Sequence, residues 1–99
     1  MSDGPLTYER LLELARAAEG VELRTVSGRA FTVGIARTSE IFFTPASSGW
    51  GQTDGRKAHE RFVERYNEIG SPRPGDYGDV TRNASYLLGL LDWAESDRE

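Results

Sequence analysis

The chain has 99 residues, of which 37% are hydrophobic and 28% charged, a balance that fits one folded domain and excludes a disordered chain. It contains no cysteine, so disulfides and thiolate metal sites are excluded. No apolar run approaches the about 20 residues that span a bilayer, and residues 1–5 do not resemble a secretory leader. We therefore expect a single domain over residues 1–99, cytoplasmic and without membrane contact, whose ends at 1–4 and 95–99 are frayed.

The net charge of −4 is unevenly distributed along the chain. Residues 1–23 carry two basic and five acidic side chains, and residues 83–99 carry one and four, so each end has a charge of −3. Residues 24–82 carry nine basic and seven acidic side chains, a charge of +2. The net charge opposes bulk attraction to nucleic acid, but the middle of the chain permits a local basic surface.

The first part of the chain predicts a helix followed by strands. Apolar residues recur at helical spacing between residues 6 and 18, with Thr7 as the N-cap and Gly20 at the C-terminal end. The period then changes to two, which predicts strands over residues 21–24, 31–35 and 41–44. Ser27-Gly28 is placed to form a tight hairpin turn between the first two strands.

The second part predicts two more helices. One begins after a cap at Thr53 or Asp54 and ends at Gly70; its buried stripe is expected to be Ala58, Phe62, Tyr66 and Ile69. Residues 71–79 hold two prolines and two glycines and predict an irregular connector. The last helix is expected to start near Asp79 or Thr81 and to run to about Ala94.

The predicted fold is α+β, in the order α-β-β-β-α-α, with a three-stranded antiparallel meander and the helices packed on one face. Phe42 should point to the opposite face, because side chains alternate along a strand. The expected core consists of Leu11, Phe31, Val33, Ile35, Ile41, Phe43, Phe62, Leu87 and Leu91.

The residue types needed for catalysis are scarce. His59 is the only histidine, and a pairing of it with Ser47 or Ser48 lacks the glycine pattern of a nucleophile elbow. On the second helix His59 lies beside Phe62 and other apolar residues, which is typical of a histidine at the edge of a core. We therefore predict a protein that is not an enzyme and has no cofactor or metal.

A glycine-rich loop, "TPASSGWGQTDG", spans residues 44–55 and leads into the second helix. Hydroxyls and amides in the loop, the free N–H groups of a helix start, and a basic stripe on the helix together resemble a phosphate-contacting surface. An ordinary solvated helix face with weak ion pairs is the alternative explanation. The candidate nucleic-acid-binding residues are Ser47, Ser48, Gly49, Trp50, Arg56, Lys57, Arg61 and Arg65.

Over residues 6–69, the α-β-β-β-α order and the stretch "GWGQTDGRKA" resemble the double-stranded-RNA-binding domain, in which a glycine-containing loop precedes a lysine-rich helix start. The resemblance implies that Arg56, Lys57 and Arg61 contact phosphates across a groove. The chain departs from that pattern in having a single lysine, a longer loop, acidic residues within the helix, and an additional helix.

The last helix has a second apolar face. Such a helix is either enclosed within its own domain or covered by a partner, which here means another protein or a second copy of the chain. The candidate interface consists of Arg82, Tyr86, Leu90 and Trp93. Two functions remain: a nucleic-acid-binding module, which we favour, and a protein-interaction module or small regulator or inhibitor. Salt distinguishes them, because only phosphate contacts weaken steeply as salt rises.

Overall fold

A computed structural model describes residues 5–37 and 39–97. Its elements follow the order α-β-β-β-α-α, which confirms the predicted arrangement and the α+β class. The expected frayed residues 1–4 and 98–99 lie outside the described residues, whereas residues 95–97 are helical rather than frayed. The elements are α1 (Tyr8–Ala18), β1 (Leu23–Arg24), β2 (Ala30–Ile35), β3 (Ile41–Pro45), α2 (Arg56–Ile69), the 3₁₀ helix η1 (Pro74–Tyr77) and α3 (Ala84–Asp97).

The three strands form one antiparallel sheet in the order β1-β2-β3, which is the predicted meander. Leu23 pairs with Phe31, and Val33 pairs with Phe43. The hairpin between β1 and β2 turns at Gly28, whose φ of +90° suits a residue without a Cβ atom. The meander therefore follows directly from the alternating pattern and the turn residue.

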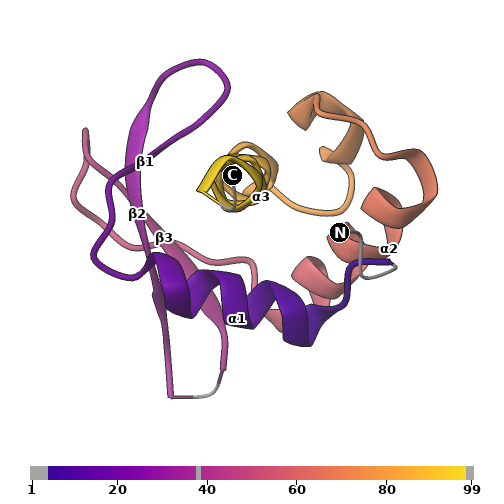
Figure 1. The fold of residues 1–99 in the computed structure, drawn as a ribbon, viewed down its shortest axis with the longest axis horizontal. Coiled ribbons are helices and arrows are strands. Elements are labelled where there is room, and N and C mark those ends of the chain that lie inside the picture. Colours follow the sequence, from indigo (N-terminus) through magenta and orange to yellow (C-terminus); the bar gives the residue numbers. More distant parts are fainter. Residues whose placement is uncertain (1–4, 38, 98–99) are drawn as a thin grey trace.

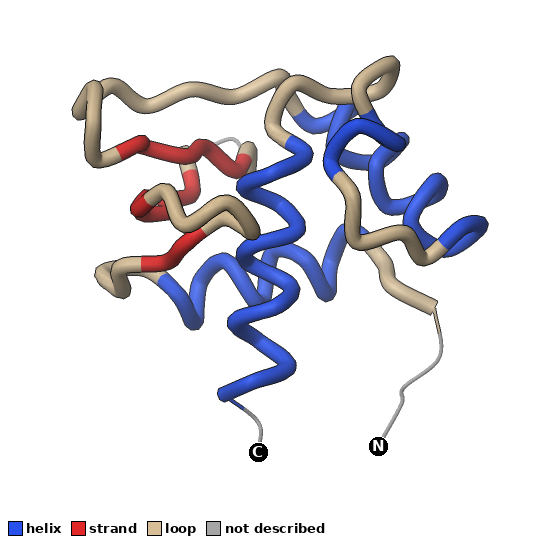
Figure 2. The backbone as a smooth tube through the Cα atoms, turned by 90° about the horizontal axis from the view of Figure 1, so that it is seen from above, coloured by secondary structure: helices blue, strands red, loops and turns tan. Residues whose placement is uncertain are grey.

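Helix α3 runs through the middle of the molecule. Figure 1 looks along α3 and shows the sheet at the left, α1 below, and α2 with η1 at the right. The view in Figure 2 shows the same arrangement from above, with the sheet on one side of α3 and α2 on the other. The first strand, α1 and η1 all contact α3, and α1 also packs on β2. The sheet thus has an inner face covered by helices, as predicted.

The composition of α3 explains its central place. Apolar residues surround it on nearly every side, and a helix that is apolar all round is stable only when buried. Gly89 permits a close approach to the sheet, since a Cβ atom there would lie 2.7 Å from the carbonyl oxygen of Arg24. Tyr86 packs on two aromatic rings of the sheet, with ring centroids 5.0 Å from Phe31 and 5.6 Å from Phe43.

The predicted core is present with one exception. Phe42 points away from Phe43, as expected, and its ring covers Gly34 on the outer face of the sheet. Ile35, at the end of β2, is only partly buried. The buried members are Leu11, Phe31, Val33, Ile41, Phe43, Phe62, Leu87 and Leu91.

The start and the buried side of α2 differ from the prediction. The N-cap is Gly55, whose N–H donates to the Thr53 hydroxyl oxygen at 3.0 Å. No side chain caps the first turn, because the Thr53 hydroxyl donates to Ile41 and Asp54 bonds to Thr81. The buried side consists of His59, Phe62 and Val63, so the helix is rotated relative to the expected stripe, and Ile69 is 49% exposed. A buried histidine in place of an aliphatic residue explains why hydrophobic spacing alone gave the wrong side.

The last helix also starts later than expected, at Ala84 rather than near Asp79 or Thr81, and η1 occupies part of the connector expected to be irregular. No helix in residues 5–37 and 39–97 is long and apolar enough to cross a bilayer.

Candidate functional site

The loop of residues 44–55 folds back along the edge of β3. Gln52 exchanges two backbone hydrogen bonds with Phe43, of 2.8 and 2.9 Å, and the Thr53 hydroxyl donates to the carbonyl of Ile41 at 2.7 Å. Figure 2 shows this connection crossing from the sheet to α2. The Ser47–Trp50 turn therefore lies at one end of β3, and the start of α2 lies near the other end. The four extended residues between Trp50 and the helix start span about 13 Å. The structure does not bring the turn and the helix start together.

The turn itself is well defined by its backbone. Gly49, with φ of +71°, donates its N–H to the carbonyl of Pro45 at 2.8 Å, and the Trp50 N–H donates to the Ser48 hydroxyl oxygen at 3.3 Å. Ala46 donates to the carbonyl of Ala30, which joins the turn to the start of β2. The Trp50 side chain is nevertheless 80% exposed. An ordered turn thus presents a large aromatic ring to solvent.

The predicted basic stripe on α2 is divided by ion pairs. Arg65 forms two hydrogen bonds with Asp79, of 3.0 and 3.1 Å, and a third with the carbonyl of Asp76. Arg56 bonds to Glu60 at 2.9 Å and lies over the ring of Tyr8. Both guanidinium groups are therefore already engaged.

The predicted stripe consists of Lys57, Arg61 and Arg65, and Arg56 is a separate candidate at the start of the helix. Lys57 and Arg61 are exposed and form no ion pair among the described residues. Only these two cations of the stripe are available to a phosphate without breaking an existing contact.

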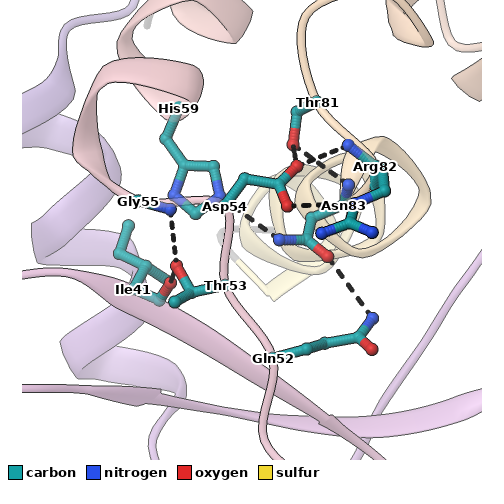
Figure 3. Close-up of polar contacts among 9 residues, drawn as sticks. All are labelled: Ile41, Gln52, Thr53, Asp54, Gly55, His59, Thr81, Arg82 and Asn83. Carbon is teal, nitrogen blue, oxygen red and sulfur yellow. Dashed lines mark hydrogen bonds and ion pairs between the residues drawn. The ribbon is translucent and has the colours of Figure 1, made fainter.

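A polar cluster joins the end of the loop to the start of α3 (Figure 3). Asp54 is its centre: it accepts hydrogen bonds from the Thr81 hydroxyl at 2.7 Å and from the backbone N–H of Arg82 at 2.5 Å. The Asp54 side chain is only 13% exposed, and the Arg82 guanidinium lies 3.5 Å from its other oxygen. Asp54 therefore binds the residues that lead into α3, almost thirty positions later in the sequence, and not the start of α2 beside it.

Asn83 and His59 extend this cluster into the core. The Asn83 amide nitrogen lies 3.5 Å from His59 Nε2, and its amide oxygen accepts a hydrogen bond from Gln52 at 3.4 Å. The ring of His59 also packs edge-on against Phe43. His59 and Asn83 are almost completely buried, and His59 Nδ1 has no hydrogen-bond partner among the described residues.

Burial determines the ionisation of this histidine. It lowers the pKa of His59, and the negative charge of Asp54 only partly offsets this. Burial alone would raise the pKa of Asp54, but the hydrogen bonds from Thr81 and Arg82 outweigh it and lower that pKa. The imidazole of His59 is enclosed, and Ser47 and Ser48 are exposed on the distant turn, so the structure does not bring these side chains together.

An open depression of about 390 Å³ borders the cluster at the start of α2. The carboxylates of Asp54 and Asp79 line it, and both are already paired with arginines. Within residues 5–37 and 39–97, no group of three or more His, Cys, Asp or Glu side chains could hold a metal ion.

The three members of the predicted partner interface that lie on α3 pack inside the domain, so the prediction of an exposed apolar patch on this helix is wrong. Leu90 is fully buried, and Tyr86 packs against the sheet, while Trp93 is partly buried. Of the predicted set, only Arg82 has an exposed side chain, at 89%. On the second apolar face of α3, Tyr86 packs on the sheet, while Leu90 and Trp93 pack within the core of the same domain. This is the other alternative, enclosure within the domain.

Sequence reasoning missed Asp54 and Asn83 as organising residues. Their partners lie far away in sequence, so no local spacing indicates them: Asp54 was expected only as a cap of its own helix, and Asn83 only as part of the last helix. Comparisons with protein-family models, with curated proteins and with solved structures find no match to this chain.

Proposed function

We propose that this protein is a non-enzymatic binding module that contacts nucleic acid through the Ser47–Trp50 turn. The observation that carries the proposal is the 80% exposure of Trp50 on a turn whose backbone is held by hydrogen bonds. Exposed aromatic rings on ordered loops are the groups on which unpaired bases stack. Ser47 and the backbone around Gly49 supply nearby hydrogen-bonding groups for a sugar or phosphate.

The basic stripe contributes less to this proposal than the sequence suggested. Arg56 and Arg65 are held in ion pairs, so Lys57 and Arg61 remain as a cationic pair on α2, separate from the turn. We assign them the role of contacting phosphates that flank the bases at the turn. Each such contact releases condensed counterions, so each contributes about 0.7 to the salt slope for a single strand.

The proposal is tested by the fluorescence of Trp50. The chain has two tryptophans, so Trp93→Phe leaves Trp50 as the only indole. Titration of this variant with an oligothymidylate should quench the emission, because a stacked base contacts the indole directly. The affinity should fall steeply as salt rises, and Lys57→Gln with Arg61→Gln should flatten the logarithmic slope by about 1.4.

The matched control is Arg73→Gln, which removes a cation whose side chain is 83% exposed but which lies beyond α2, near η1. That variant should keep the slope of the parent. Absence of binding to single-stranded or duplex nucleic acid at low salt would contradict the proposal.

A protein partner at the same end of the sheet is the second candidate function. Val26, at the tip of the β1–β2 hairpin, is 62% exposed, and the hairpin and the turn lie at the same end of the strands. An apolar contact with Val26 and Trp50 would be nearly indifferent to salt. A salt-independent complex that is lost in both Val26→Ser and Trp50→Ala would favour this second function.

A further inference from the structure

The outer face of the sheet has an unusual set of side chains. The strands alternate, so the inward residues are covered by helices while the outward residues face away from them. No acidic residue occurs in any of the three strands or in the segment from Ala46 to Thr53. The outward positions are Arg24, Ala30, Thr32, Gly34, Phe42 and Thr44.

Phe42 lies flat in the middle of this face. A Cβ atom added at Gly34 would lie 2.7, 3.0 and 3.2 Å from three atoms at the end of the Phe42 ring, so the ring extends over Gly34. A Cβ atom at Gly51 would lie 3.1 Å from the side of the same ring. Two glycines therefore make room for the ring to lie along the sheet, and it remains partly exposed. The Phe42 ring therefore lies beside Gly51, the residue directly after Trp50.

Charge is also unevenly distributed between the sheet with its turn and the rest of the chain. Residues 23–53, which hold the sheet and the turn, carry three arginines and one glutamate, a charge of +2. The rest of the chain carries nine basic and fifteen acidic residues, a charge of −6. Arg24 is paired with Glu22 at 3.1 Å, and with this glutamate counted the segment has a charge of +1 against −5 for the rest of the chain. The sheet and the turn therefore oppose a polyanion less than the rest of the chain does, apart from the exposed Lys57 and Arg61 on α2.

We infer that Phe42 is a second stacking position and that the ligand is a single-stranded nucleic acid lying across the outer face of the sheet from Trp50. This rests on the proposed function and names the class of nucleic acid. In a duplex the bases are stacked on each other inside the helix, so an aromatic ring lying flat on a sheet cannot reach their faces. Apart from Phe42, the outward positions hold threonine, glycine, alanine and arginine, without the aliphatic residues that bury a protein partner.

The test compares Phe42→Leu with Phe42→Tyr. Leucine keeps an apolar cover over Gly34 but removes the aromatic ring, whereas tyrosine keeps the ring. For a single-stranded oligothymidylate of about ten nucleotides, Phe42→Leu should weaken binding about tenfold, and Phe42→Tyr should bind like the parent. Thermal unfolding of each variant checks that the fold is intact. Equal affinity for a duplex of the same length would overturn the inference.

A second measurement uses the unaltered chain, so it does not depend on how the variants fold. An oligonucleotide containing 5-iodouracil is cross-linked by light, and the modified peptides are mapped. Adducts on both Phe42 and Trp50 support the inference, and adducts on Trp50 alone overturn it while leaving the proposed function in place. Failure of the unaltered chain to bind any nucleic acid removes both.

Discussion

A methyl group added at Gly34 and one added at Gly89 would each lie 2.7 Å from the nearest atom, yet the two faces of the sheet make these contacts different. On the inner face the atom is the backbone carbonyl oxygen of Arg24, which is fixed by its strand. On the outer face it is the end of the Phe42 ring, which can turn about its side-chain bonds. Close packing on the inner face therefore depends on fixed backbone atoms, whereas on the outer face it depends on a side chain that can move.

The largest effect is expected for Gly89→Ala. Alanine is the better helix former by about 1 kcal/mol, but its methyl group would overlap a backbone oxygen and the ring of Phe31. We expect the cost of this steric overlap to exceed the gain in helix propensity, so the free energy of unfolding should fall by about 3 kcal/mol. Denaturant unfolding measures this, and a variant as stable as the parent would show that α3 can move away from β1.

Asp54→Ala tests the polar cluster that fixes α3 on the inner side. The substitution removes the acceptor of two hydrogen bonds, from Thr81 and from the N–H of Arg82. A hydrogen bond to a charged group contributes about 1.5–3 kcal/mol, so we expect a loss of about 2 kcal/mol in unfolding free energy. Ser48→Ala, in the exposed half of the same loop, is the control and should change stability by under about 0.5 kcal/mol.

The buried histidine predicts a dependence of stability on pH. The pKa of His59 is lowered in the folded protein, so below pH about 6.5 the unfolded chain takes up a proton that the folded chain does not. Stability should therefore be complete above that pH and should fall on acidification, by at most about 1.4 kcal/mol per pH unit. Urea titrations between pH 5 and pH 8 measure the slope. If the His59→Gln variant shows the same slope, the pH dependence of stability arises from titratable groups other than His59.

A smaller stability effect than that of Gly89→Ala is expected for Gly34→Ala on the outer face. The Phe42 ring can swing aside, so unfolding free energy should change by no more than about 1 kcal/mol. The displaced ring should nevertheless weaken binding to single-stranded nucleic acid. A loss of stability equal to that of Gly89→Ala would remove the contrast between the two faces.

The order of elements was predictable because it depends on local patterns. The period of two around Phe31 and Phe43, the turn at Gly28 and the Thr7 cap each act within a few residues. The same alternation placed Phe42 on the outer face. These features need no knowledge of distant contacts.

The candidate site was less predictable, because its geometry depends on contacts between distant segments. Arg65 looked free in the sequence, but Asp79 meets it only once η1 folds back toward α2. The path of the loop depends on the pairing of Gln52 with Phe43, which separates Trp50 from the helix that follows. The neighbouring apolar residues placed His59 at the edge of the core, but they could not show that Asn83 reaches it from the start of another helix.

The central position of α3 has a consequence for how this chain acquires its structure. The inner face of the sheet, α1 and η1 all bury their apolar side chains against residues 84–94, which are the last of these elements in sequence. Without that helix, Phe31 and Phe43 lose their contacts with Tyr86, and the packing of α1 on β2 covers only part of the core. We therefore expect the chain to unfold cooperatively, and a chain truncated before α3 to lack a complete core.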